Sequence, residues 1–96
     1  MRNTNEQSLK QVIDEMMHRQ KLKGKLTEVR IQECWEKVMG PTISQRTLGL
    51  ALKNKTLFVK INSAPLKHEL SFNLPRLVEL INEEMRENVI TEVVLS

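Results

Sequence analysis

The stretch from Thr47 to Leu70 constrains most strongly what this chain can fold into. Apolar residues alternate with other residues on both sides of residues 53–56, which is the pattern of two β-strands joined by a tight turn. A two-residue turn at Asn54 and Lys55 fixes which residues face each other. The predicted pairs are Leu52 with Leu57, Leu50 with Val59, and Leu48 with Ile61. Because strand side chains alternate between the two faces, all six aliphatic residues should lie on one face.

The opposite face of this hairpin carries an aromatic ring among small and basic residues. In the same register Ala51 faces Phe58, Gly49 faces Lys60, and Thr47 faces Asn62. An exposed ring surrounded by positive charge is typical of a surface on which single-stranded nucleic acid stacks. We therefore predict nucleic-acid contacts from Arg46, Lys53, Lys55, Phe58 and Lys60. The alternative is that a helix or a second copy of the chain covers Phe58, and that the lysines only solvate an edge.

Two helices are expected before the hairpin. Apolar residues recur at helical spacing from about Glu6 to Lys21, and Gly24 just beyond them indicates a helix end. A second amphipathic helix should begin near Thr27 and end at Gly40, which Pro41 follows. This second helix places Cys34 and Trp35 on its apolar side. We expect both in the core, with the indole N–H bonded to a partner.

A long helix and a third strand are expected after the hairpin. Ser63 is a suitable N-cap for a helix that starts at Leu66, and Pro75 should kink or split this helix near Phe72. The β-branched segment Val89–Leu95 predicts a short strand, parallel to the second one if a right-handed crossover joins them. The order helix, helix, strand, strand, helix, strand predicts a two-layer α+β domain, with helices packed on a three-stranded sheet.

Length and composition exclude several classes of protein. The 96 residues are enough for one domain, predicted at 6–96 after a flexible tail at 1–5. A single cysteine rules out an internal disulfide and a four-cysteine zinc site. No apolar run approaches ~20 residues and the start lacks a signal-peptide core, so we expect a cytoplasmic protein without a membrane segment. His18 and His68 have no second ligand at metal spacing, and no catalytic set is evident, so no metal, cofactor or enzymatic activity is expected.

The net charge of +3 is unevenly distributed. Residues 1–76 hold 14 of the 15 basic side chains, whereas residues 77–96 hold five acids and Arg86 alone. Five basic residues near the first helix junction are predicted to contact phosphates, the alternative being a solvated turn that stabilises the helix dipole. They are Arg19, Lys21, Lys23, Lys25 and Arg30. Three acids of the long helix are predicted to contact a protein partner, although such acids usually face solvent. They are Glu79, Glu83 and Glu84.

Several short motifs follow one another between Leu9 and Leu95. They are Trp35-Glu-Lys-Val38-Met-Gly40, Ile43, Thr47, Leu57-Phe-Val59, Ser63-Ala-Pro65, Glu69-Leu70 and Ile81-Asn82. Together they resemble the bacterial DciA-like family, long catalogued as a domain of unknown function. The resemblance implies a KH-like α+β fold, nucleic-acid binding, and association with the replicative DnaB-type helicase during its loading onto DNA. The chain has no Gly-x-x-Gly loop, with which KH domains clamp a nucleotide backbone, so the resemblance concerns the fold rather than that mechanism.

The leading prediction is therefore a non-enzymatic KH-like module that binds single- or double-stranded DNA, or RNA, and associates with the replicative helicase. Many members of the family carry an extended tail, and this chain ends at Ser96, so it resembles a short form. The alternative prediction is a protein-interaction or homodimerising domain that does not bind nucleic acid.

Overall fold

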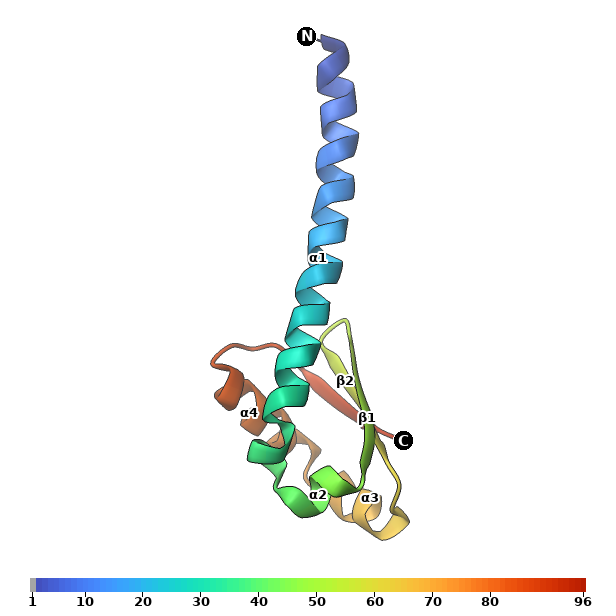
Figure 1. The fold of residues 1–96 in the computed structure, drawn as a ribbon, viewed down its shortest axis with the longest axis vertical. Coiled ribbons are helices and arrows are strands. Elements are labelled where there is room, and N and C mark those ends of the chain that lie inside the picture. Colours follow the sequence, from blue (N-terminus) through green and yellow to red (C-terminus); the bar gives the residue numbers. More distant parts are fainter. Residues whose placement is uncertain (1) are drawn as a thin grey trace.

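The computed structural model describes the backbone of residues 2–96 and the side chains of residues 8–96. The predicted flexible tail at residues 1–5 lies outside the described side chains, and its flexibility stays a prediction. Two helices precede the hairpin, and two further helices and a third strand follow it (Figure 1). They are α1 (Arg2–Met39), α2 (Pro41–Gln45), β1 (Thr47–Lys53), β2 (Thr56–Ile61), α3 (Ala64–Ser71), α4 (Leu74–Met85) and β3 (Glu92–Leu95).

The elements form two layers, as predicted. One face of the three-stranded sheet is covered by α4 and by the C-terminal half of α1, while the N-terminal half of α1 projects away from the domain (Figure 1). The predicted order of helices and strands is confirmed, and the long helix divides between Ser71 and Leu74. Pro75 is the reason for this division, because its nitrogen has no hydrogen to donate to Ser71. The described helices include none that is long and apolar enough to cross a membrane.

The predicted end of a helix at Gly40 is confirmed, but the predicted break at Gly24 and new start near Thr27 are wrong, because the two predicted helices form the single helix α1, and the short helix α2 follows it. α1 runs through Gly24 without a break. A glycine inside a helix costs only about 1 kcal/mol relative to alanine, and the lysine, leucine and glutamine residues around it favour helix. Gly40 ends α1 with a φ of 89°, a conformation that side chains other than glycine rarely adopt, and Pro41 follows it.

The hairpin is confirmed in its turn and in most of its register. Asn54 and Lys55 have φ of 49° and 63°, as a two-residue type I′ turn requires. The pairs Leu52–Leu57 and Leu50–Val59 form on the inner face, and Ala51–Phe58 and Gly49–Lys60 form on the outer face.

The register changes at the base of the hairpin, where the prediction was wrong. A β-bulge between Thr47 and Gly49 pairs Thr47 with Ile61, so Leu48 does not face Ile61 and is 59% exposed. The bulge turns Thr47 inward, where its hydroxyl accepts a hydrogen bond from the indole Nε1 of Trp35 at 3.0 Å. The same hydroxyl donates to the carbonyl oxygen of Ile43 at 2.7 Å. The extra residue of the bulge therefore gives the buried indole N–H of Trp35 an acceptor, the Thr47 hydroxyl, which a regular strand would not place there.

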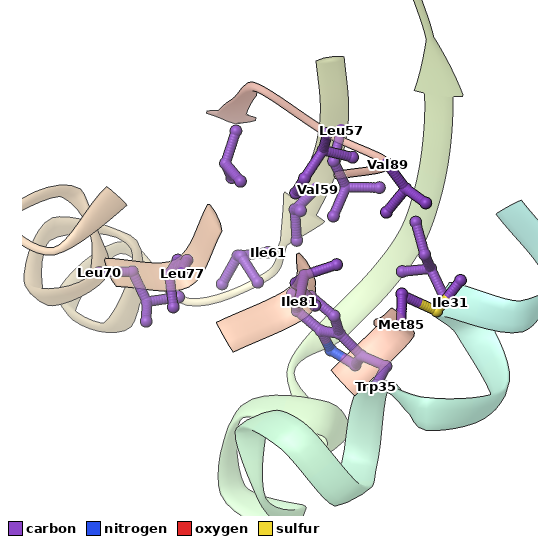
Figure 2. Close-up of a cluster of buried hydrophobic side chains, with 12 residues drawn as sticks. Ile31, Trp35, Leu57, Val59, Ile61, Leu70, Leu77, Ile81, Met85 and Val89 are labelled. Carbon is purple, nitrogen blue, oxygen red and sulfur yellow. The ribbon is translucent and has the colours of Figure 1, made fainter. Parts of the chain in front are cut away.

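The core lies between the sheet and the two covering helices. Ile31 and Trp35 of α1 lie beside Ile81 and Met85 of α4, below the apolar face of β2 (Figure 2). Trp35 is 4% exposed, which confirms its predicted place in the core, and Cys34 is half-buried beside the same cluster. The remaining buried members are Leu57, Val59, Ile61, Leu70, Leu77, Val89, Ile90 and Val93.

β3 pairs with β2 in parallel, as predicted, but it begins at Glu92 rather than at Val89. Val89 and Ile90 lie in the connection that precedes the strand, where Asn82 of α4 holds their backbone. The Asn82 side-chain oxygen accepts from the N–H groups of Val89 and Ile90 at 2.9 and 3.1 Å, and its amide nitrogen donates to the Ile90 carbonyl at 2.9 Å. The side-chain bonds replace strand pairing in this segment.

Candidate nucleic-acid interface

The fold brings two separately predicted basic groups together where α1 passes the tip of the hairpin. A groove of about 680 Å³ on one side of α1 is lined by Lys21, Lys25 and Lys53. A second groove of about 420 Å³ is lined by Lys23 and Lys55. Five lysines therefore surround one junction, although the α1 lysines and the hairpin lysines are at least 28 residues apart in the sequence. We call Lys21, Lys23, Lys25, Lys53 and Lys55 the lysine collar.

The backbone of the junction leaves both grooves open. Gln20, Gly24, Leu52 and Asn54 line both of them, so the two grooves meet at these residues. A Cβ built at Gly24 would contact no atom within 4 Å, so the space beside the helix is not filled by the hairpin. The type I′ turn projects Lys53 and Lys55 from the hairpin on either side of α1. An extended polyanion can therefore reach lysines of both elements.

Two acidic side chains also line the collar. Glu28 lies 3.9 Å from Lys25, and its other carboxylate oxygen accepts a hydrogen bond from the backbone N–H of Leu52 at 2.8 Å. Glu87 lines the second groove. Among the described side chains, Lys21, Lys23, Lys53 and Lys55 form no ion pair within 4.0 Å. The collar thus keeps an excess of positive charge that is available to phosphates.

The outer face of the sheet continues from the collar. Phe58 is 39% exposed, with Ala51 beside it on β1 and Val94 beside it on β3. Lys60, two residues after Phe58 on the same face of β2, is also exposed. The side chain of Phe58 is therefore partly open to solvent, and its exposed part is accessible for stacking.

The other predicted basic residues lie outside the collar. Arg46 is at the base of the hairpin, at the opposite end from the turn. Arg30 lies one helical turn before Cys34 and lines neither of the two grooves. Arg19 is one turn from Lys23 and lies 3.9 Å from Glu15. Of these three arginines, only Arg19 is close enough along the helix to extend the collar.

The three predicted acidic residues do not form one surface. Glu84 is bonded to Lys37 of α1 at 2.9 Å, an ion pair that raises the pKa of Lys37. Glu79 lies 3.2 Å from Arg76 and shares a groove of about 510 Å³ with Glu83. Glu84 therefore links two helices, whereas Glu79 and Glu83 remain together on an exposed side of α4.

The role of Glu28 could not be predicted from the sequence pattern. Its carboxylate binds the outward N–H of Leu52, and Gln32, one turn later, donates to the Leu50 carbonyl at 3.4 Å. Both are ordinary polar residues of an amphipathic helix, and only the position of α1 along β1 reveals their function. Within residues 8–96, no group of three or more histidine, cysteine, aspartate or glutamate side chains is arranged to hold a metal ion.

Comparison with known proteins adds one finding to this geometry. A family model described as "Dna[CI] antecedent, DciA" matches residues 8–95, nearly the whole chain. No curated protein and no solved structure matches the chain.

Proposed function

The chain belongs to the DciA family, which is associated with DNA replication and helicase loading, and we propose that it is a non-enzymatic DNA-binding accessory of the replicative DnaB-type helicase. On this proposal it acts in the cytoplasm and uses no cofactor. The observation that supports DNA binding most directly is the lysine collar, in which α1 and the hairpin tip present five cationic side chains around two connected grooves.

The collar and Phe58 have different roles in this proposal. Lysines bind the phosphates of a nucleic acid of any base sequence, because each neutralised phosphate releases counterions from the nucleic acid. Phe58 adds stacking with an unpaired base, which a duplex does not offer. We therefore expect the chain to bind single-stranded DNA more tightly than a duplex of equal length, and with little preference for sequence.

Fluorescence anisotropy with a labelled single-stranded oligonucleotide tests this role. If about four phosphates are engaged, log K should fall with log salt with a slope of roughly −3. The variant Lys53→Gln/Lys55→Gln removes two collar charges and should reduce the steepness of this slope by about 1.4. The control Lys10→Gln/Arg76→Gln removes the same charge from exposed positions away from the collar and should leave the slope nearly unchanged. Equal losses in both variants would show that only net charge matters.

Stacking is tested with the two phenylalanines of the chain. Phe58→Ala should weaken single-strand binding by about 1–3 kcal/mol, the usual cost of a lost stacking partner. Phe72→Ala is the matched control, because Phe72 is 68% exposed but lies between α3 and α4 rather than on the sheet. An unchanged affinity in folded Phe58→Ala would remove this ring from the site.

The helicase association needs a separate experiment, a pull-down of the purified DnaB-type helicase from the same organism. Retention of the helicase without DNA supports the association, and its clean absence contradicts it. If the helicase binds while the oligonucleotide does not bind even at low salt, the alternative of a protein-interaction domain without nucleic-acid binding is correct.

A further inference from the structure

The three-stranded sheet has two edges, and one of them is closed. β1 forms the first edge. The outward N–H of Leu52 donates to Glu28, and the outward carbonyl of Leu50 accepts from Gln32. Two side chains of α1 thus occupy the positions where a further strand would bind. Closing an edge in this way prevents unwanted strand pairing.

The second edge, β3, has its outward groups open. Ser96 donates to the Val59 carbonyl and accepts from the N–H of Ile61, both at 2.9 Å, so its backbone groups face β2. Successive residues of a strand direct their backbone groups to alternate sides, so Val93 and Leu95 direct theirs away from β2. In the described part of the chain, β3 pairs with no other strand.

A groove of about 610 Å³ runs along this open edge. β3 supplies Val93, Val94 and Leu95 to one wall, and α3 with the start of α4 supplies the rest. Those residues are Ala64, Lys67, His68, Ser71 and Leu74. The lining contains two basic side chains and no acidic one, next to mostly apolar surface.

We propose that this groove binds an extended peptide segment of a partner protein, which adds to β3 as a fourth strand and directs an acidic side chain toward Lys67 and His68. The row of outward groups on β3 alternates donors and acceptors at strand spacing, which a peptide backbone matches. A nucleic-acid strand offers phosphate acceptors but no regular row of donors for the Val93 and Leu95 carbonyls. The inference goes beyond the proposed function, because it requires neither DNA nor the helicase.

The probe for this site is a phage-displayed library of random 12-residue peptides, selected on the full chain. Selected sequences should alternate apolar residues with at least one acid. Amide hydrogen exchange of the chain with a selected synthetic peptide then locates the binding. We expect the peptide to protect the Val93 and Leu95 amides, which exchange quickly in the free chain, while Ser96 changes little because it is already bonded to β2.

A pair of substitutions isolates the backbone contribution. Leu95→Pro removes the outward donor and is compatible with an edge strand, whereas Leu95→Ala shortens the side chain and keeps the donor. Leu95→Pro should bind the peptide about tenfold more weakly than Leu95→Ala, the effect of one backbone hydrogen bond. Lys67→Glu, which leaves the strand intact, should also weaken binding of the acidic peptide and serves if Leu95→Pro does not fold.

Four outcomes would overturn the proposal. The first is that the library yields no enriched sequence. The second is that selected peptides bind without protecting the Val93 and Leu95 amides from exchange. The third is that a single-stranded oligonucleotide protects these two amides instead, which would assign the groove to nucleic acid. The fourth is that protection of the two amides rises with the concentration of the chain without any peptide, which would assign the edge to a second copy of the chain.

Discussion

Replacing Thr47 with valine should remove the hydroxyl that accepts a hydrogen bond from the buried indole N–H of Trp35. The two groups are 3.0 Å apart, and the same hydroxyl donates to Ile43 at 2.7 Å. Valine has nearly the same shape, so the change leaves no cavity but orphans a buried donor, which costs about 1–3 kcal/mol. We expect the free energy of unfolding to fall by about 2 kcal/mol. For a chain of this size, such a loss lowers Tm by roughly 8–16 °C.

Urea denaturation measures this loss, and the fluorescence of Trp35, the only tryptophan of the chain, reports the same region. Thr42→Val in α2 is the matched control, because Thr42 is exposed and undergoes the same chemical change. The control should change the free energy of unfolding by less than about 0.5 kcal/mol.

A double-mutant cycle separates the hydrogen bond from other effects of the substitution. Trp35→Phe removes the indole donor, so Thr47→Val should cost at least about 1 kcal/mol less in that background than in the parent. Equal costs in both backgrounds would show that the hydroxyl does not stabilise the protein through Trp35. The explanation of the bulge at Leu48 would then be wrong.

Three further predictions concern single residues. Gly24→Ala should raise the free energy of unfolding by about 0.5–1 kcal/mol, because the glycine lies inside α1 with open space at its Cβ; thermal denaturation measures this, and a decrease would mean that the helix needs flexibility there. Asn82→Ala should cost about 3 kcal/mol in urea denaturation, because three hydrogen bonds to the segment before β3 are lost; a loss below about 1 kcal/mol would contradict this. Burial, together with the Glu84 carboxylate, raises the pKa of the Cys34 thiol above its ordinary value of 9.0. The folded chain therefore keeps this proton longer than the unfolded chain, so stability should fall as the pH rises above 9.0, and iodoacetamide at pH 8 should modify the folded chain more slowly. Equal rates for folded and unfolded chains would contradict the burial.

Local patterns in the sequence predicted much of the fold, because the interactions that determine them lie within a few residues. Alternating side chains and a two-residue turn determine the hairpin register from Gly49 to Lys60. Ser63 caps α3 by accepting from Leu66, as its position indicated. Pro75 divides the last two helices through its missing N–H. The family resemblance was also contained in the sequence alone.

The candidate site was predictable only as separate pieces. The basic residues of α1 and of the hairpin tip were each identified, but their union depends on α1 continuing through Gly24 and passing the turn. The break expected at Gly24 would have placed Lys21 and Lys25 on different elements. Arg46 and Arg30, equally basic in sequence, lie elsewhere because charge says nothing about position in space.

The sequence by itself determined the two-layer class, the turn and the inward face of the hairpin, since each follows from periodicity and backbone geometry. Only the tertiary structure decided the bulge at Leu48, the closed edge at β1 and the open edge at β3. Each of these depends on a partner far along the chain: Trp35 for Thr47, Glu28 for Leu52, and the parallel pairing of β2 for β3. A buried donor or an outward backbone group must find its partner in three dimensions, and no short-range pattern records which residue that will be.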